Sequence, residues 1–213
     1  QISKVLRINI KVAKGLGSFF ELQLSVINID MLDLYKFLTD HISNFAKENG
    51  EMIFQDGKTR IIMTIRSEIL TLFRIHIGNI KENNKNIITE KFIPALYEPL
   101  LDQFMNIHPL VRDHHVVSLF EVLIEKTGTE AKSLLPQIFS TLIKNTAEMV
   151  ETRKSEFSEH GVKLYRLLKA IFVHCFPVIL SLNESDFMYL YTRVINGVDH
   201  RSGEISRLGL EIV

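Results

Sequence analysis

The fold is decided by one stretch, residues 86–128, which has the sequence NIITEKFIPALYEPLLDQFMNIHPLVRDHHVVSLFEVLIEKTG. Both halves carry apolar residues three and four positions apart, the spacing of one face of an α-helix: Ile93, Leu96, Tyr97, Leu100 and Phe104 in the first, and Val116, Val117, Phe120, Leu123, Ile124 and Thr127 in the second. The turn His108-Pro109 separates the halves, and Gly128 supplies the left-handed residue expected after a helix. We therefore predict a helical hairpin, which needs similar neighbours to bury its apolar faces.

The rest of the chain supplies such neighbours. The same spacing predicts helices over about residues 5–14, 19–27, 30–49, 58–80, 130–150 and 158–175, with further helices after the predicted N-cap Asn183 and from about residue 202. Gly17 and Gly50 are expected to end two of these helices. We expect a structureless polar loop over residues 81–86 and a charged connection over residues 151–156. No segment alternates like a strand, so the sequence predicts an all-α protein.

An internal repeat indicates how these helices are organised. The segment Phe92-Ile93-Pro94-Ala95-Leu96 is echoed by Leu134-Leu135-Pro136-Gln137-Ile138, which places the two prolines 42 residues apart. Leucines recur at similar intervals in the second helix of each predicted pair: Leu72, Leu119, Leu167 and Leu208. HEAT and armadillo arrays repeat every 40–47 residues or so. We predict an α-α superhelix, a HEAT-repeat solenoid built from antiparallel helix pairs.

We expect residues 1–213 to form a single solenoid segment of about four to five helix pairs. The approximate pairs are 19–49, 58–80 with an uncertain partner, 86–128, 130–175 and 183–213. Both ends of the chain lie within apolar helical patterns and lack terminating signals. We interpret this as a segment truncated at both ends.

Composition excludes several classes of protein. Apolar residues make up 46% of the chain and charged residues 23%, which is typical of a globular protein. The 25 basic and 25 acidic residues balance, and no dense basic run offers a site for nucleic acid. The single cysteine, Cys175, rules out an internal disulfide framework. No apolar stretch is long enough to span a membrane, and no signal peptide is recognised.

Three short motifs could carry chemistry, and each has a simpler explanation. Asp113-His114-His115 resembles a metal site, but adjacent helical residues point about 100° apart, so a solvated helix is favoured. His174-Cys175 could be a thiol–imidazole pair, yet the spacing places Cys175 on the inward face as a small buried residue. Lys14-Gly15-Leu16-Gly17-Ser18 lacks the order of a phosphate-binding loop. We therefore predict no catalytic, cofactor-binding or metal-binding residues, no cofactor and no enzymatic activity.

Several segments, in the same order and spacing, resemble the exportin-1 family of nuclear-export receptors within the importin-β-like (karyopherin) superfamily. The resemblance covers essentially the whole chain and rests on INIKVAKGLG (8–17), DMLDLYK (30–36), NGEM (49–52), EKFIPAL (90–96), PQIF (136–139) and HCFP (174–177). Residues 61–65 and 81–86 depart from the family pattern.

The resemblance implies a run of repeats from the C-terminal half of a ring-like solenoid, in which the second helix of each pair lines the inner surface. It implies a receptor that binds leucine-rich export signals together with GTP-bound Ran, contacts nuclear pore proteins, and shuttles between nucleus and cytoplasm. This segment would be scaffold and a Ran-contact surface. The cargo groove and the family's reactive cysteine would lie in other repeats, and Cys175 does not match that cysteine.

Polar faces of the second helices are the natural candidates for partner contact. On the helices predicted over residues 58–80 and 110–127, these faces carry Arg66, Arg74, Arg112 and Asp113. The alternative function is a HEAT scaffold of another class, such as a phosphatase regulatory subunit or another karyopherin. An α-helical enzyme would require a polar pocket with perturbed carboxylates, and the sequence encodes no such constellation.

Overall fold

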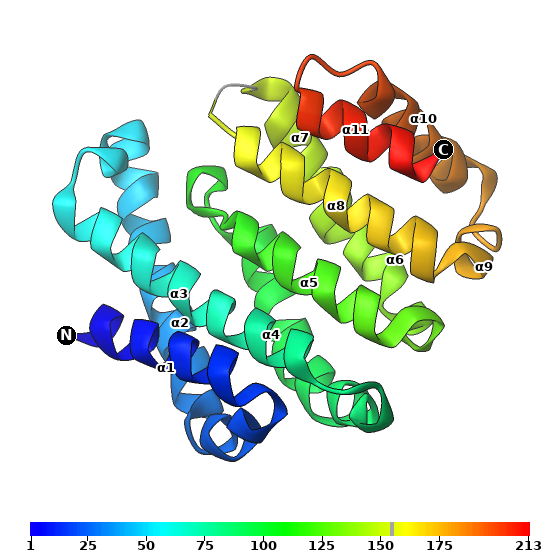
Figure 1. The fold of residues 1–213 in the computed structure, drawn as a ribbon. Helices are drawn as coiled ribbons and strands as arrows, with labels where there is room; N and C mark the ends of the chain where they lie inside the picture. Colours follow the sequence, from blue (N-terminus) through cyan, green and yellow to red (C-terminus); the bar gives the residue numbers. More distant parts are fainter. Residues whose placement is uncertain (154–155) are drawn as a thin grey trace. The chain divides into compact units, whose positions relative to one another are not determined.

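The computed structural model describes residues 1–153 and 156–213, and in these residues it contains helices and no strand (Figure 1). The predicted all-α, HEAT-type fold is therefore confirmed. The chain divides into two compact units, Gln1–Leu119 and Phe120–Val213. Part of the predicted connection over residues 151–156 lies outside the described residues. Within the described ranges, no helix is both long and apolar enough to cross a membrane.

Unit 1 is built around three long helices, α1 (Ile2–Leu16), α2 (Glu21–Asn49) and α3 (Gly57–Asn79). The 3-10 turns η1 (Gly17–Phe20) and η2 (Gly50–Phe54) connect them. Helix α2 packs against α3 as an antiparallel pair, and α1 lies alongside α3 (Figure 1). The unit continues through η3 (Glu82–Asn84), the π-helical turn η4 (Ile88–Phe92), α4 (Ile93–Asn106), η5 (Pro109–Val111) and the first turns of α5 (His114–Thr127).

Unit 2 repeats the helix-pair arrangement. After α5 the chain passes through η6 (Gly128–Ser133), α6 (Leu135–Gln137), the π-helical segment η7 (Ile138–Ile143) and α7 (Lys144–Thr152). It then forms α8 (Ser158–His174), the short α9 (Phe176–Ile179), α10 (Glu184–Val198) and α11 (Gly203–Ile212). Helix α7 packs against α8, α10 packs against α11, and α8 and α11 lie side by side (Figure 1).

Helix ends follow the local signals in the sequence. Gly17, Gly50 and Gly128 have φ angles of 58°, 55° and 55°, a region that glycine enters without a steric penalty. The predicted left-handed glycine at Gly128 is thereby confirmed. The Asn183 side chain accepts a hydrogen bond of 2.9 Å from the backbone N–H of Asp186, as expected of an N-cap.

Two predictions of local structure are wrong. The sequence predicted separate helices over residues 19–27 and 30–49, whereas α2 is continuous from Glu21 to Asn49. No glycine or proline lies within these residues, so nothing interrupts the backbone hydrogen bonds. Residues 81–86 were expected to be structureless, but they contain η3, in which the Asn84 N–H donates to the Lys81 carbonyl at 2.9 Å.

The recurring leucines are buried, as the repeat predicts. Within unit 1, Leu72 on α3 and Leu119 on α5 are fully buried. Within unit 2, Leu167 on α8 and Leu208 on α11 are also buried. Each contributes about 1.5–3 kcal/mol relative to an exposed side chain. The repeat in the sequence thus marks the same structural position in successive second helices.

Two glycines allow close helix packing in unit 2. A Cβ atom added at Gly197 on α10 would lie 2.1 Å from Cε1 of Tyr165 on α8. One added at Gly209 on α11 would lie 2.6 Å from the backbone nitrogen of Val198. The Tyr165 hydroxyl donates a hydrogen bond of 2.8 Å to the Arg193 carbonyl, which fixes the ring beside Gly197. Helices α8, α10 and α11 therefore depend on the absence of these two side chains.

Candidate functional site

The predicted contact residue Arg66 lies inside unit 1 rather than on its surface. Its side chain is 1% exposed. Nε donates to Thr39 Oγ1 at 2.8 Å, and Nη1 donates to the Val111 carbonyl at 3.0 Å. The guanidinium also lies over the Tyr35 ring, 5.1 Å from the centroid, and Nη2 donates to the Tyr35 hydroxyl at 3.4 Å. Arg66 therefore joins α2, α3 and the turn η5.

Asp113 is the N-cap of α5 and is also buried. Its Oδ2 accepts a hydrogen bond of 2.8 Å from Ser67 Oγ, and its Oδ1 accepts one of 2.8 Å from the backbone N–H of His115. His115 Nδ1 lies 2.9 Å from the same Oδ1. Burial alone would raise the pKa of Asp113, but the hydrogen bond and charge of His115 and the charge of Arg66 outweigh burial and lower it. The carboxylate is thus held ionised inside the unit.

The Tyr35 hydroxyl completes this polar network. Burial raises its pKa, and the nearby Arg66 charge only partly opposes that rise. Tyr35 therefore stays neutral at physiological pH. The network joins the buried side chains of Tyr35, Thr39, Arg66 and Asp113 to the half-buried Ser67, and it satisfies their polar groups within the unit.

The prediction that Arg66 and Asp113 lie on exposed polar faces is wrong, because both side chains are buried. Arg74 and Arg112 are half-buried. Arg112 lies over the Phe104 ring, 5.5 Å from its centroid, and Nη2 donates to the Met105 carbonyl at 3.3 Å. The four residues therefore do not form one exposed surface. Whether any of them contacts a partner stays a prediction.

The Asp113-His114-His115 motif is more compact than helix geometry alone suggested. One possible ligand atom from each side chain lies within 4.8 Å of the other two, and the two imidazole centroids are 4.3 Å apart. The expectation that the two rings diverge is therefore wrong, because side-chain torsions bring them together in the first turn of α5. However, both Asp113 oxygens already accept hydrogen bonds, so the N-cap accounts for the motif.

Cys175 is the small buried residue that the sequence predicted. Its thiol is fully buried, and Sγ donates to the Gly128 carbonyl at 3.1 Å. Burial raises the pKa of this thiol, whereas a nucleophilic cysteine needs a lowered pKa. His174 is exposed on the neighbouring position and does not share this environment. The pair is therefore unsuited to nucleophilic catalysis.

His76 was not singled out in the sequence, yet it is the most unusual histidine of unit 1. It is fully buried on α3, with ring centroids 6.1 Å from Phe20 and 5.3 Å from Phe92. Neither ring nitrogen has a hydrogen-bond partner among the described residues. Burial lowers its pKa, which the charge of Glu21 opposes. His76 is therefore neutral in the folded unit.

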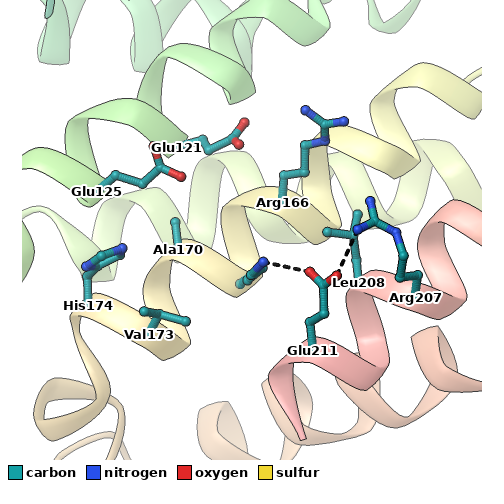
Figure 2. Close-up of a pocket in the computed structure, with 10 residues that line it drawn as sticks. Glu121, Glu125, Arg166, Ala170, Val173, His174, Arg207, Leu208 and Glu211 are labelled. Atoms are coloured by element: carbon teal, nitrogen blue, oxygen red, sulfur yellow. Dashed lines mark hydrogen bonds and ion pairs between the residues drawn. The ribbon is translucent and has the colours of Figure 1, made fainter. Parts of the chain in front are cut away.

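A charged groove of about 450 Å³ lies on the second helices of unit 2 (Figure 2). Glu121 and Glu125 of α5 form one side, and residues of α8 and α11 form the floor and the other side. Lys169 Nζ lies 2.6 Å from Glu211 Oε2, and Arg207 Nη1 lies 2.8 Å from Glu211 Oε1. The groove is therefore a polar concavity lined by both acids and bases.

Sequence reasoning missed the groove, although one signal was present. Arg166 and Arg207 each directly precede a recurring leucine, Leu167 and Leu208. Residues at one repeat position share a face of the stack, so two arginines at this position indicate a charged surface. Each arginine, taken alone, also fits an ordinary solvated helix, so only a comparison of the repeats predicts the charged surface.

Comparisons with known proteins cover nearly the whole chain. Residues 23–213 match a family model described as CRM1 C terminal. The chain is 27% identical over 212 residues to Protein EXPORTIN 1B of Arabidopsis thaliana, and 24% identical over 214 residues to Exportin-1 of Drosophila melanogaster. It is 27% identical over 212 residues to Exportin-1 of Schizosaccharomyces pombe. Each alignment covers 100% of this chain and 20% of the relative, so the chain spans about a fifth of the length of these curated relatives.

Proposed function

Because the chain belongs to the CRM1 C-terminal family, we propose that it is a non-enzymatic segment of a nuclear export receptor. The observation that carries this proposal is the family match over residues 23–213. The buried polar groups of unit 1 support it, since they hold helices together and offer no reactive site. The raised pKa of the Cys175 thiol supports it as well.

The receptor would bind leucine-rich export signals together with GTP-bound Ran and carry them through the nuclear pore. It would contact nuclear pore proteins and shuttle between nucleus and cytoplasm. In this proposal the present segment is scaffold, with a Ran-contact surface on its second helices, and the cargo groove lies in other repeats.

Coupling between Ran and cargo would act through the curvature of the helix stack. A ligand shifts a conformational equilibrium only by its difference in affinity for the two states. If both ligands prefer the same curvature, each raises the affinity for the other by the same factor. Arg66 would serve this mechanism indirectly, because it links α2, α3 and η5. Arg74 and Arg112 remain the candidates for direct contact.

The proposal is tested by isothermal titration calorimetry with the full-length protein and a peptide carrying a leucine-rich export signal. Peptide affinity is expected to rise when Ran loaded with a non-hydrolysable GTP analogue is present, and not when Ran carries GDP. Equal peptide affinity in all three conditions would contradict the proposal.

The contact surface is tested by charge reversal in the same protein. Arg74→Glu and Arg112→Glu are expected to weaken Ran binding, whereas Arg60→Glu, at an exposed position on α3, serves as the matched control. Unchanged Ran affinity in both test variants would retire these residues as contacts.

A further inference from the structure

One junction of unit 1, where η1 and η4 meet α3, centres on a buried histidine. His76 lies near the C-terminal end of α3, and none of its surface is exposed. Its imidazole lies beside Phe20 of η1 and Phe92 of η4, with ring centroids 6.1 and 5.3 Å away. Both flanking rings are buried as well. His76 therefore joins two turns, far apart in the sequence, to the same helix.

The polar atoms of this imidazole gain nothing from the junction. Neither Nδ1 nor Nε2 has a hydrogen-bond partner among residues 1–153 and 156–213. A buried nitrogen without a partner loses its hydration without compensation. The ring thus packs like an aromatic core residue, but it keeps the ability to take up a proton.

The charged groups around the junction do not neutralise such a proton. The field of Glu21, the first residue of α2, favours the protonated imidazole, but burial outweighs it and lowers the pKa of His76. Glu21 Oε1 already lies 3.2 Å from Lys91 Nζ of η4. Turn η1 carries no ionisable side chain, and Glu90, the other charged residue of η4, is exposed. A proton on His76 therefore places an uncompensated charge in an apolar contact.

We propose that His76, Phe20 and Phe92 form an acid-sensitive latch that holds η1 and η4 against α3. A buried imidazolium needs water or an anion, and it reaches water when the two rings part from it. Uptake of a proton therefore opens the junction. Because η1 leads into α2 and η4 leads into α4, opening releases the N-terminal ends of both helices from α3. The latch needs no partner and is independent of the proposed function.

The direction of the pH dependence follows from the linkage between proton binding and opening. In the open junction His76 is hydrated and titrates near its ordinary pKa of 6.5, whereas in the closed junction its pKa is lower. The open form therefore binds the proton more readily, and the closed form loses stability as the pH falls below 6.5. General acid unfolding would affect both units, whereas this opening is confined to one junction of unit 1.

The test is hydrogen–deuterium exchange of the full-length protein at pH 7.5 and pH 5.5, measured by mass spectrometry. Each rate is divided by the intrinsic exchange rate at the same pH. Peptides covering residues 17–24 and 88–96 report on the latch, and peptides covering residues 203–212 report on unit 2. The test variant is His76→Phe, which keeps an aromatic ring and removes both nitrogens. The matched control is His41→Phe, because His41 is an exposed histidine on α2 of the same unit.

In the unmodified protein, the protection of residues 17–24 and 88–96 is expected to fall about tenfold at pH 5.5, one unit below the ordinary pKa. Residues 203–212 should keep their protection. His76→Phe should abolish the loss, and His41→Phe should retain it.

Unchanged protection of the two latch segments in the unmodified protein would overturn the proposal, and this comparison requires no variant to fold. An equal loss in His76→Phe would overturn it as well. So would an equal loss over residues 203–212, which would indicate general acid unfolding.

Discussion

The two units place their charged residues in opposite locations. Unit 1 buries Arg66 and Asp113 in a hydrogen-bonded network, whereas the buried polar residues described in unit 2 are hydroxyl-bearing side chains and His160. Unit 2 places Arg166, Arg207 and Glu211 on the groove surface, and it packs its helices through Gly197 and Gly209. An arginine on a second helix is therefore structural in one unit and surface-exposed in the other. Residue type alone does not indicate whether such an arginine is buried or exposed.

The largest expected effect comes from removing the buried guanidinium. Arg66→Ala leaves the Val111 carbonyl and Thr39 hydroxyl without their donor and removes the charge facing Asp113. We expect a loss of about 3–5 kcal/mol in the free energy of unfolding, measured by urea denaturation. Arg60→Ala, at an exposed position on the same helix, should change it by less than about 0.5 kcal/mol. Equal stability of the two variants would show that the network contributes nothing.

The next effect tests the close packing of unit 2. Gly197→Ala places a Cβ atom 2.1 Å from Tyr165 Cε1, so the ring or a helix must shift. We expect destabilisation of about 1–3 kcal/mol, despite the higher helix propensity of alanine. Gly203→Ala is the matched control, because nothing lies within 4 Å of its added Cβ. If Gly197→Ala unfolds at the same urea concentration as Gly203→Ala, the close approach of α8 and α10 is incorrect.

A smaller, pH-dependent effect is expected at His76. Burial lowers its pKa below the ordinary 6.5, so below pH 6.5 the unfolded chain binds this proton more readily than the folded unit. Its contribution to stability is therefore full above pH 6.5 and is lost as the pH falls from 6.5 through the lowered pKa of the folded unit. His76→Phe should raise the free energy of unfolding by about 1 kcal/mol at pH 7, because it removes two buried nitrogens without partners. It should also flatten the pH dependence between pH 7 and 5, and an unchanged slope would contradict this origin.

The smallest effect is expected at the ion pairs beside the groove. Lys169→Ala removes a contact with Glu211, but both side chains are partly exposed and Arg207 still pairs with Glu211. We expect the unfolding midpoint to stay nearly constant, and any difference to vanish in high salt. A large loss in thermal melting that persists in high salt would mean that this surface is structural, like the network of unit 1.

Local features of the fold could be predicted from the sequence, because their causes lie within a few residues. Gly128 ends α5, and Asn183 caps α10 through a group three residues away. The burial of Arg66 could not be predicted in this way. Its hydrogen-bond partners Thr39 and Val111 lie 27 and 45 residues away in the chain, and only the packed helices bring them together. The helical spacing of Arg66 fitted an exposed face equally well.

The candidate groove shows the same limit. Glu121 and Glu125 are four residues apart on α5, so their common face was predictable. In the structure these glutamates face residues of α8, and Arg166 pairs with Glu204. Both arrangements depend on contacts between separate helices, which the spacing along one helix does not reveal. The arginines before two of the four recurring leucines, Leu167 and Leu208, were visible in the sequence. Their ion pairs with Glu204 and Glu211 were not visible, and these pairs decide whether the arginines are available to a partner.

The central claim is that the buried charges of unit 1 hold the fold, whereas the partly exposed ion pairs of unit 2 contribute little to it. It is tested most directly by measuring the urea midpoint of unfolding side by side for Arg66→Ala and Lys169→Ala. The account predicts that Arg66→Ala lowers the midpoint and that Lys169→Ala leaves it nearly unchanged. An unchanged midpoint in Arg66→Ala, or an equally large loss in Lys169→Ala, would contradict it.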